Sequence, residues 1–167
     1  MLRAARACIR LGWPLFVQSY TEGGLQEATT FIGQIETSLG EVTRGLLCLR
    51  TGAPSGTVVI EISGPAGLRT AEILARAGLL PDTVTILTGG GGGYLLYAHP
   101  GVFVPSGANL LGPGVHVQAD GGHIQLPPSR NRNNGFQLKW TSGKPQRPST
   151  PLHPRILSAL RDQALAA

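Results

Sequence analysis

Cysteine is scarce in this chain of 167 residues, and long hydrophobic runs are missing. The two cysteines, Cys8 and Cys48, stand in apolar surroundings without the paired spacing of a zinc site or a disulfide framework. No segment reaches the length of a membrane span, and the stretch 1–16 lacks the uninterrupted apolar core of a signal peptide. These absences argue against a secreted disulfide-rich domain and against a membrane protein, and we expect buried thiols and a cytoplasmic location.

Several common catalytic and binding motifs are also missing. The five glycines 89–93 are not followed by Gly-Lys-Ser/Thr, and they end at Tyr94 instead of opening a helix, which excludes a Walker loop and a dinucleotide fingerprint. No Gly-x-Ser-x-Gly elbow occurs, and neither cysteine has a histidine nearby in a nucleophile motif. The glycine run therefore has two open interpretations: a flexible loop between strands, or backbone amides presented to a phosphate.

Acidic residues are absent between Asp120 and Asp162, although this part of the chain holds half of the basic residues. The basic side chains that follow Asp120 are Arg130, Arg132, Lys139, Lys144, Arg147, Arg155 and Arg161. A block of one sign attracts phosphate-bearing partners through counterion release. The alternative is a basic end that only improves solubility, and charge alone does not separate the two.

The hydrophobic pattern predicts an α/β (α+β) domain with a mixed, largely antiparallel sheet flanked by helices. We expect helices over 2–11, from Thr29 or Thr30 to Leu39, and over 65–77, with buried strands at 46–49, 58–62 and 84–87. After Tyr94 short strands follow one another between glycine and proline turns. We predict one domain over 1–142, a proline-rich connector over 143–154, and a C-terminal helix over 155–167 that packs on the same domain.

The segment 111–129 contains two short apolar strands around a glycine corner. Val115 to Val117 and Ile124 to Leu126 alternate apolar and polar residues, and Gly121-Gly122 is predicted as the tight turn between them. Because side chains alternate across a strand, the polar residues between the apolar ones should face solvent or a cleft. These residues are His116, Gln118, His123 and Gln125.

Six segments, in order, resemble the bifunctional DNA primase/polymerase (prim-pol) domain of the archaeo-eukaryotic primase superfamily. They are Arg10-Leu-Gly-Trp-Pro-Leu-Phe16, Ala28-Thr-Thr30, the strand from Gly45 to Thr51 with Ser55-Gly-Thr-Val-Val-Ile-Glu-Ile-Ser63, Leu80-Pro-Asp-Thr83, Thr88-Gly-Gly-Gly-Gly92, and Leu111 to Ser129. The resemblance implies DNA-directed nucleotidyl transfer with Mg or Mn held by acidic residues, in replication of a plasmid, phage or integrated element.

Residue by residue, the resemblance places the family's two first acids on Glu61 and Ser63, its histidine on Tyr94 and its third acid on His116. It also implies nucleotide binding by Gly90, Gly91, Gly92 and Gln118. The basic block predicts DNA binding by Arg130, Arg132, Lys139, Lys144 and Arg147, and side-chain chemistry indicates Glu61 and His116 as metal ligands. Only Glu61 keeps the family's chemistry. Serine supplies no charge, and histidine is a poor ligand for magnesium although it accepts softer metals.

We therefore expect a DNA primase/polymerase-like protein with a degenerate active site that keeps nucleic-acid or nucleotide binding. Two alternatives stay open. One is an active primase/polymerase with a remodelled, manganese-preferring site of Glu61, His116 and Asp120, and the other is a remnant with a stable fold and no ligand. DNA and nucleotides are the expected partners, and because no helicase motif precedes Ala167, we expect a helicase or replication initiator on a separate chain.

Overall fold

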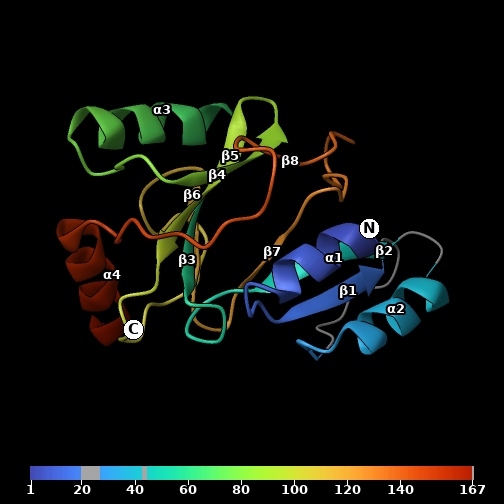
Figure 1. Cartoon of the computed structure of the whole chain (residues 1–167). Helices are drawn as coiled ribbons and strands as arrows, with labels where there is room; N and C mark the ends of the chain where they lie inside the picture. Colours follow the sequence, from blue (N-terminus) through green and yellow to red (C-terminus); the bar gives the residue numbers. More distant parts are fainter. Residues whose placement is uncertain (20–26, 43–44, 167) are drawn as a thin grey trace.

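The computed structural model describes residues 1–19, 27–42 and 45–166, and these residues form two β-sheets and four helices. The helices are α1 (Leu2–Ile9), α2 (Ile32–Glu41), α3 (Gly64–Arg76) and α4 (Pro154–Ala166). Figure 1 shows α1 and α2 beside the smaller sheet on the right, with α3 and α4 around the larger sheet on the left.

The smaller sheet has the order β1-β2-β7 and the larger one the order β6-β3-β5-β4-β8. The strands are β1 (Leu15–Ser19), β2 (Gly45–Arg50), β3 (Thr57–Ile62), β4 (Val84–Gly89), β5 (Gly92–Ala98), β6 (Val115–Gln118), β7 (His123–Gln125) and β8 (Lys139–Trp140). These strands pair antiparallel, and parallel pairing among the described residues is limited to the isolated bridges Ala98–Pro151 and Pro105–Asp120. The predicted α+β class is confirmed.

Strand β3 is hydrophobic along most of its length because both of its faces are covered. Val58 and Ile60 belong to a buried cluster that also holds Ile156 and Leu160 of α4. Val59 belongs to a second cluster, which includes residues of both sheets. Helix α4 thus packs against the larger sheet, while Ala167, the last residue of the predicted helix, lies outside the described residues.

The glycine corner at Gly121-Gly122 differs from the prediction. We expected a tight turn between two paired strands, but β6 pairs with β3 in the larger sheet whereas β7 pairs with β2 in the smaller one. The chain crosses from one sheet to the other at this corner. A Cβ on Gly122 would lie 2.6 Å from the Ser106 hydroxyl and 2.9 Å from Oε1 of Gln118, so the crossing needs glycine for its close contacts.

The predicted start of α2 was also wrong. Phe31 rather than Thr29 or Thr30 occupies the N-cap position, and the Thr29 hydroxyl accepts a hydrogen bond from the Phe31 N–H at 3.0 Å just before the helix. Gly40 lies inside the last turn instead of ending the helix. For α3 the prediction agrees with the structure, because Pro65 lies in the first turn and Gly78 follows the helix with φ of +70°.

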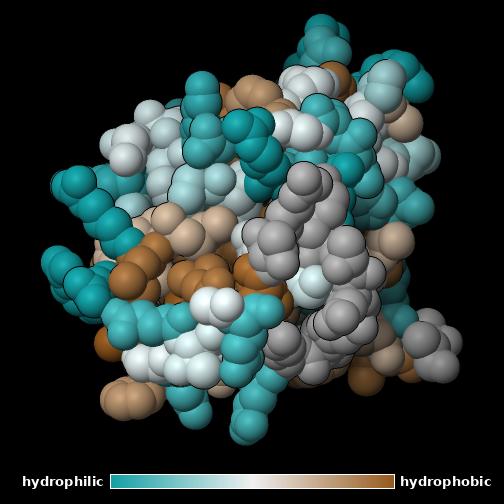
Figure 2. Space-filling view, turned by 90° about the vertical axis from the view of Figure 1, so that its right-hand side faces the viewer, coloured by the Kyte–Doolittle hydropathy of each residue, from teal (hydrophilic) through white to brown (hydrophobic). Residues whose placement is uncertain are grey.

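None of the described helices is both long and apolar enough to cross a membrane. Figure 2, viewed from the right-hand side of Figure 1, shows hydrophobic surface near the middle of this face, bordered by hydrophilic side chains.

Candidate functional site

Three of the predicted site residues form one row across the larger sheet. Glu61 on the interior strand β3 lies opposite His116 of β6 on one side and opposite Tyr94 of β5 on the other. Residues directly opposite each other on neighbouring strands point to the same face of a sheet. The sequence separation of the three residues is large, but the register brings them together.

Two adjoining cavities lie on this face, with volumes of about 480 and 630 Å³. Both are lined by Glu61, Ser63 and Asn133, so we describe them together as the cleft. The first cavity adds residues of the glycine run and of the segment 131–134, and the second adds His116, Gln118 and His123. The four positions that the resemblance equates with the family's acids and histidine therefore share one cleft: Glu61, Ser63, Tyr94 and His116.

The Glu61 carboxylate already has a hydrogen-bond partner from the protein. Nε2 of Gln118 on β6 donates to Oε2 of Glu61 at 3.1 Å. A partly buried carboxylate that accepts an amide N–H is satisfied without an ion. Gln118, to which the resemblance assigns nucleotide binding, therefore contacts the acid in this structure.

His116 is held by the loop that precedes β6. The backbone N–H of Asn109 donates to Nδ1 of His116 at 3.0 Å, and the Asn109 side chain accepts from the Gly114 N–H at 2.7 Å. Because Nδ1 acts as an acceptor, the neutral ring carries its proton on Nε2. His116 therefore presents an N–H donor to the cleft instead of the lone pair that a metal ion requires.

Tyr94 fills the space between the two sheets. It is only 9% exposed and belongs to the hydrophobic cluster that also contains Val59 and Leu96. Burial raises the pKa of the Tyr94 hydroxyl, and the nearby Glu61 carboxylate and Cys48 raise it further. The side chain is therefore a neutral phenol.

The opposite wall of the cleft comes from β7 of the smaller sheet. His123 lines the second cavity and Gln125 the first, while Ile124 between them is buried. Burial lowers the pKa of His123, Arg50 and Arg132 lower it further, and only Glu61 acts in the other direction. The predicted direction of His116, Gln118, His123 and Gln125 toward a cleft is confirmed, but the two histidines line it from different sheets.

The glycine run forms the hairpin turn between β4 and β5. Gly90 and Gly91 have φ of +62° and +78°, which is typical of the two-residue turns that suit twisted hairpins. Gly89 lies against the segment 131–136, because an added Cβ would meet the Phe136 side chain at 2.6 Å. Gly90 and Gly92 line the cleft, whereas Gly91 lies near Leu68 of α3.

The segment 131–134 forms a wall of the cleft. Asn131 and Asn134 both donate to the carbonyl oxygen of Thr88, at 3.0 and 3.2 Å. Their side-chain oxygens accept the backbone N–H groups of Asn133 and Phe136. These asparagines fix the segment against β4, so that Arg132 and Asn133 line the cleft. The repeated asparagines at 131, 133 and 134 were the sequence signal for this contact.

Residues 5–155 match the family model described as bifunctional DNA primase/polymerase, N-terminal (Prim-Pol). The chain belongs to the Prim-Pol family. No curated protein matches the chain at a significant level. The family is one of DNA primases and polymerases, and its members generally depend on divalent metal ions.

The residues of this Prim-Pol cleft do not fit a pair of divalent cations. Glu61 is the one acid among the described residues that line it, Ser63 is neutral, and His116 offers an N–H group. Across the described part of the chain, no three His, Cys, Asp or Glu side chains form a group that could hold a metal ion. Hard divalent cations prefer several carboxylate oxygens, and the described residues of this cleft supply one carboxylate.

Asp120, which we considered as a replacement acid, has a structural role in this Prim-Pol domain. Its Oδ1 accepts from the Ala53 N–H at 2.9 Å, and its Oδ2 contacts Val104 N at 2.8 Å and His99 Nε2 at 3.1 Å. It is not among the residues that line the cleft. No sequence pattern predicted the His99–Asp120 pair, since the two residues lie in separate loops.

The predicted DNA-binding residues lie in two places. Arg130 and Arg132 belong to the segment beside the cleft, where Arg132 donates to the Ser19 carbonyl, and Lys139 follows on β8 with its ammonium 5.7 Å from the Phe136 ring centroid. Arg147 instead donates through Nε to the Leu11 carbonyl at 2.6 Å, beside the end of α1, and Lys144 is exposed. Arg132 thus lines the cleft, Arg130 lines a separate cavity with Met1 and Gly45, and Arg147 is held at α1.

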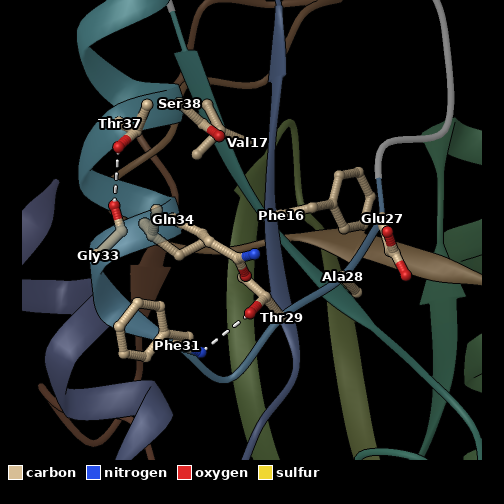
Figure 3. Close-up of a pocket in the computed structure, with 11 residues that line it drawn as sticks. Phe16, Val17, Glu27, Ala28, Thr29, Phe31, Gly33, Gln34, Thr37 and Ser38 are labelled. Atoms are coloured by element: carbon tan, nitrogen blue, oxygen red, sulfur yellow. Dashed lines mark hydrogen bonds between the residues drawn. The ribbon is translucent and has the colours of Figure 1, made fainter.

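A further cavity of about 740 Å³ lies between β1 and α2 and is separate from the cleft (Figure 3). Phe16, Phe31 and Thr29 are among its lining residues, and Glu27 is the one charged residue among them. None of the predicted site residues lines it, so it is not the candidate Prim-Pol site.

Proposed function

We propose that this chain is a Prim-Pol module that binds nucleic acid or nucleotides in a replication system and has weak or no nucleotidyl transferase activity. The observation that carries this proposal is the row His116–Glu61–Tyr94, in which one carboxylate occupies a site where the family uses several acids. Two-metal phosphoryl transfer needs concentrated negative charge to hold the ions against the phosphates. The buried free thiols of Cys8 and Cys48 are consistent with a cytoplasmic location. There the module would act beside a helicase or initiator on a separate chain.

The binding part of the proposal depends on the basic residues near the cleft. Arg132 lines the cleft, Arg130 precedes it in the same segment, and Lys139 follows on β8. No acidic residue interrupts the sequence from 121 to 161. Positive groups that contact phosphates make binding depend steeply on salt. The cleft also has the glycine turn and amide side chains at its rim, which can donate to phosphate oxygens.

The experiment is a primer-extension and de novo priming assay with magnesium and with manganese, run beside a DNA shift assay on the same preparation. We expect a shift with little or no extension. Replacing Arg130 and Lys139 by Gln should weaken the shift and lower its salt dependence. A shift that is unchanged in this variant would contradict the proposed DNA contact.

The second candidate is an active enzyme with a manganese-preferring site. The observation that favours it is the direct cross-strand position of Glu61 and His116, which would let both side chains approach one ion. This candidate predicts extension with manganese that disappears in Glu61→Ala while the far-UV circular dichroism spectrum stays unchanged. Extension that survives in Glu61→Ala would exclude it.

A further inference from the structure

The charge of the cleft suits an anion better than a pair of cations. Glu61 is the one acidic group among the described residues that line the two cavities, whereas Arg132, His116 and His123 are basic or hydrogen-bond donors. Two divalent cations carry four positive charges, and a single carboxylate leaves most of that charge uncompensated. The same residues leave room for a negatively charged group.

The hydrogen bonds around Glu61 also make it a poor metal ligand. Gln118 donates to one of its oxygens at 3.1 Å, and His116, directly opposite in the register, keeps its proton on Nε2 because Nδ1 accepts from Asn109. An ion on Oε2 would compete with this hydrogen bond, and an ion on His116 would have to remove the proton from its ring. The neighbours of Glu61 therefore act as donors.

Donors also lie on the other sides of the cleft. The Ser63 hydroxyl and the Asn133 amide line both cavities, and Arg132 lines the first one. The segment that carries Arg132 and Asn133 is fixed by the bonds from Asn131 and Asn134 to Thr88, so these donors are placed before a ligand arrives. Preorganised N–H and O–H groups bind phosphate oxygens well.

We infer that the cleft binds the phosphate groups of a nucleotide directly through protein donors, with no divalent cation between protein and phosphate. This inference rests on the nucleotide binding proposed above and specifies how it occurs. It differs from the metal-dependent mode of the family in the role of Glu61, the one acid among the described residues of the cleft. The Glu61 carboxylate repels the phosphate charge instead of holding an ion.

The first test is calorimetric titration of the full chain with dATP in excess EDTA and in excess magnesium chloride. We expect binding in EDTA with an affinity equal to or higher than that in magnesium, because magnesium on the triphosphate neutralises part of its charge. Sodium tripolyphosphate should compete with dATP. Binding only in magnesium, or no competition by tripolyphosphate, would overturn the inference while nucleotide binding itself stands.

The second test is the substitution Glu61→Gln, which keeps the size of the side chain and its contact with Gln118. If phosphate binds directly, loss of the negative charge raises dATP affinity in EDTA by about fivefold. If an ion bridges protein and phosphate, loss of the Glu61 charge lowers the affinity instead. The sign of the change therefore distinguishes direct binding from binding through an ion.

Glu72→Gln is the matched control, because Glu72 is exposed on α3, pairs with Arg76 and does not line the cleft. It changes the net charge equally and should leave the affinity unchanged. A decrease in Glu61→Gln alone overturns the inference. If dATP binds in neither buffer, the inference fails, and the DNA shift assay then decides separately whether the proposed function survives.

Discussion

At the scale of single residues, Asp120 shows how a carboxylate can be committed to structure. Partial burial raises its pKa, but the N–H groups of Ala53 and Val104 and the His99 side chain outweigh this effect, and the pKa lies below its ordinary value of 3.8. The three contacts join residues 53, 99 and 104 to the end of the segment that leaves β6. Asp120 therefore links these loops through its hydrogen bonds.

Asp120→Asn should reduce the free energy of unfolding by about 2 kcal/mol at neutral pH, since hydrogen bonds to a charged acceptor are lost or weakened. A carboxyl whose folded pKa is lowered stabilises the protein above its unfolded pKa of about 3.8, and this contribution disappears as the pH falls through the folded pKa. Urea unfolding of both proteins should show a difference that shrinks below pH 3.8. Asp162→Asn, at an exposed position of α4, is the control and should change stability by no more than about 0.5 kcal/mol.

The two thiols give a second prediction at this scale. Burial raises the pKa of both Cys8 and Cys48 to about 12, so almost no reactive thiolate exists at mildly alkaline pH. A colorimetric disulfide reagent should label neither cysteine in the native protein and both after denaturation. Native labelling at the rate of the unfolded chain would contradict this burial.

Residue-level prediction from the sequence succeeded where it depended on periodicity. The two-residue period placed His116 and His123 toward the cleft, which Glu61 and Ser63 also line. It could not show that Gln118 donates to Glu61, because this contact needs the register between strands that are far apart in sequence. Nor could it show that Asn109 sets the proton of His116, because this contact depends on the conformation of the loop before β6.

At the scale of elements, α3 and the lead into β6 approach each other through glycine. A Cβ on Gly67 would lie 2.3 Å from the carbonyl oxygen of Gly114, a backbone atom that cannot move aside. Gly67 is buried in α3, whereas Gly40 in α2 has no atom within 4 Å of the same position. The two helices therefore differ in what a methyl group would meet.

Gly67→Ala should lower the free energy of unfolding by about 2 kcal/mol or more, because the added methyl group forces the helix away from the strand. Gly40→Ala should raise it by up to about 1 kcal/mol, since alanine favours the helix. Urea denaturation of both variants measures the contrast. Destabilisation of equal size in the two would show that close packing at Gly67 is not the cause.

The elements themselves were predictable where both ends carried a local signal. Pro65 and Gly78 marked α3, and the apolar runs marked β2, β3 and β4. The crossing at Gly121-Gly122 was not predictable from the sequence. A glycine pair between two short alternating strands has the same local pattern in a hairpin as in a passage between sheets. Only the partners β2 and β3 distinguish the two.

At the scale of the whole molecule, the two sheets share one hydrophobic cluster although they have no strand pairing in common. Val17 and Leu47 of the smaller sheet belong to the same cluster as Val59 and Leu96 of the larger one. Trp13, ahead of β1, stacks on Trp140 of β8 with ring centroids 6.0 Å apart. The cleft lies between sheets that are held together by this core.

Because the core is shared, the two sheets should unfold together. Tryptophan fluorescence reports the junction between the sheets through Trp13 and Trp140, while far-UV circular dichroism reports the secondary structure of the whole chain. For one cooperative unit, urea transitions followed by the two signals coincide in midpoint and slope. Trp140→Leu should shift both midpoints downward by the same amount, since it removes the ring contact that joins the halves. Fluorescence that changes at lower urea than circular dichroism would instead mean that the sheets separate first, and the cleft would then be a hinge between two stable parts.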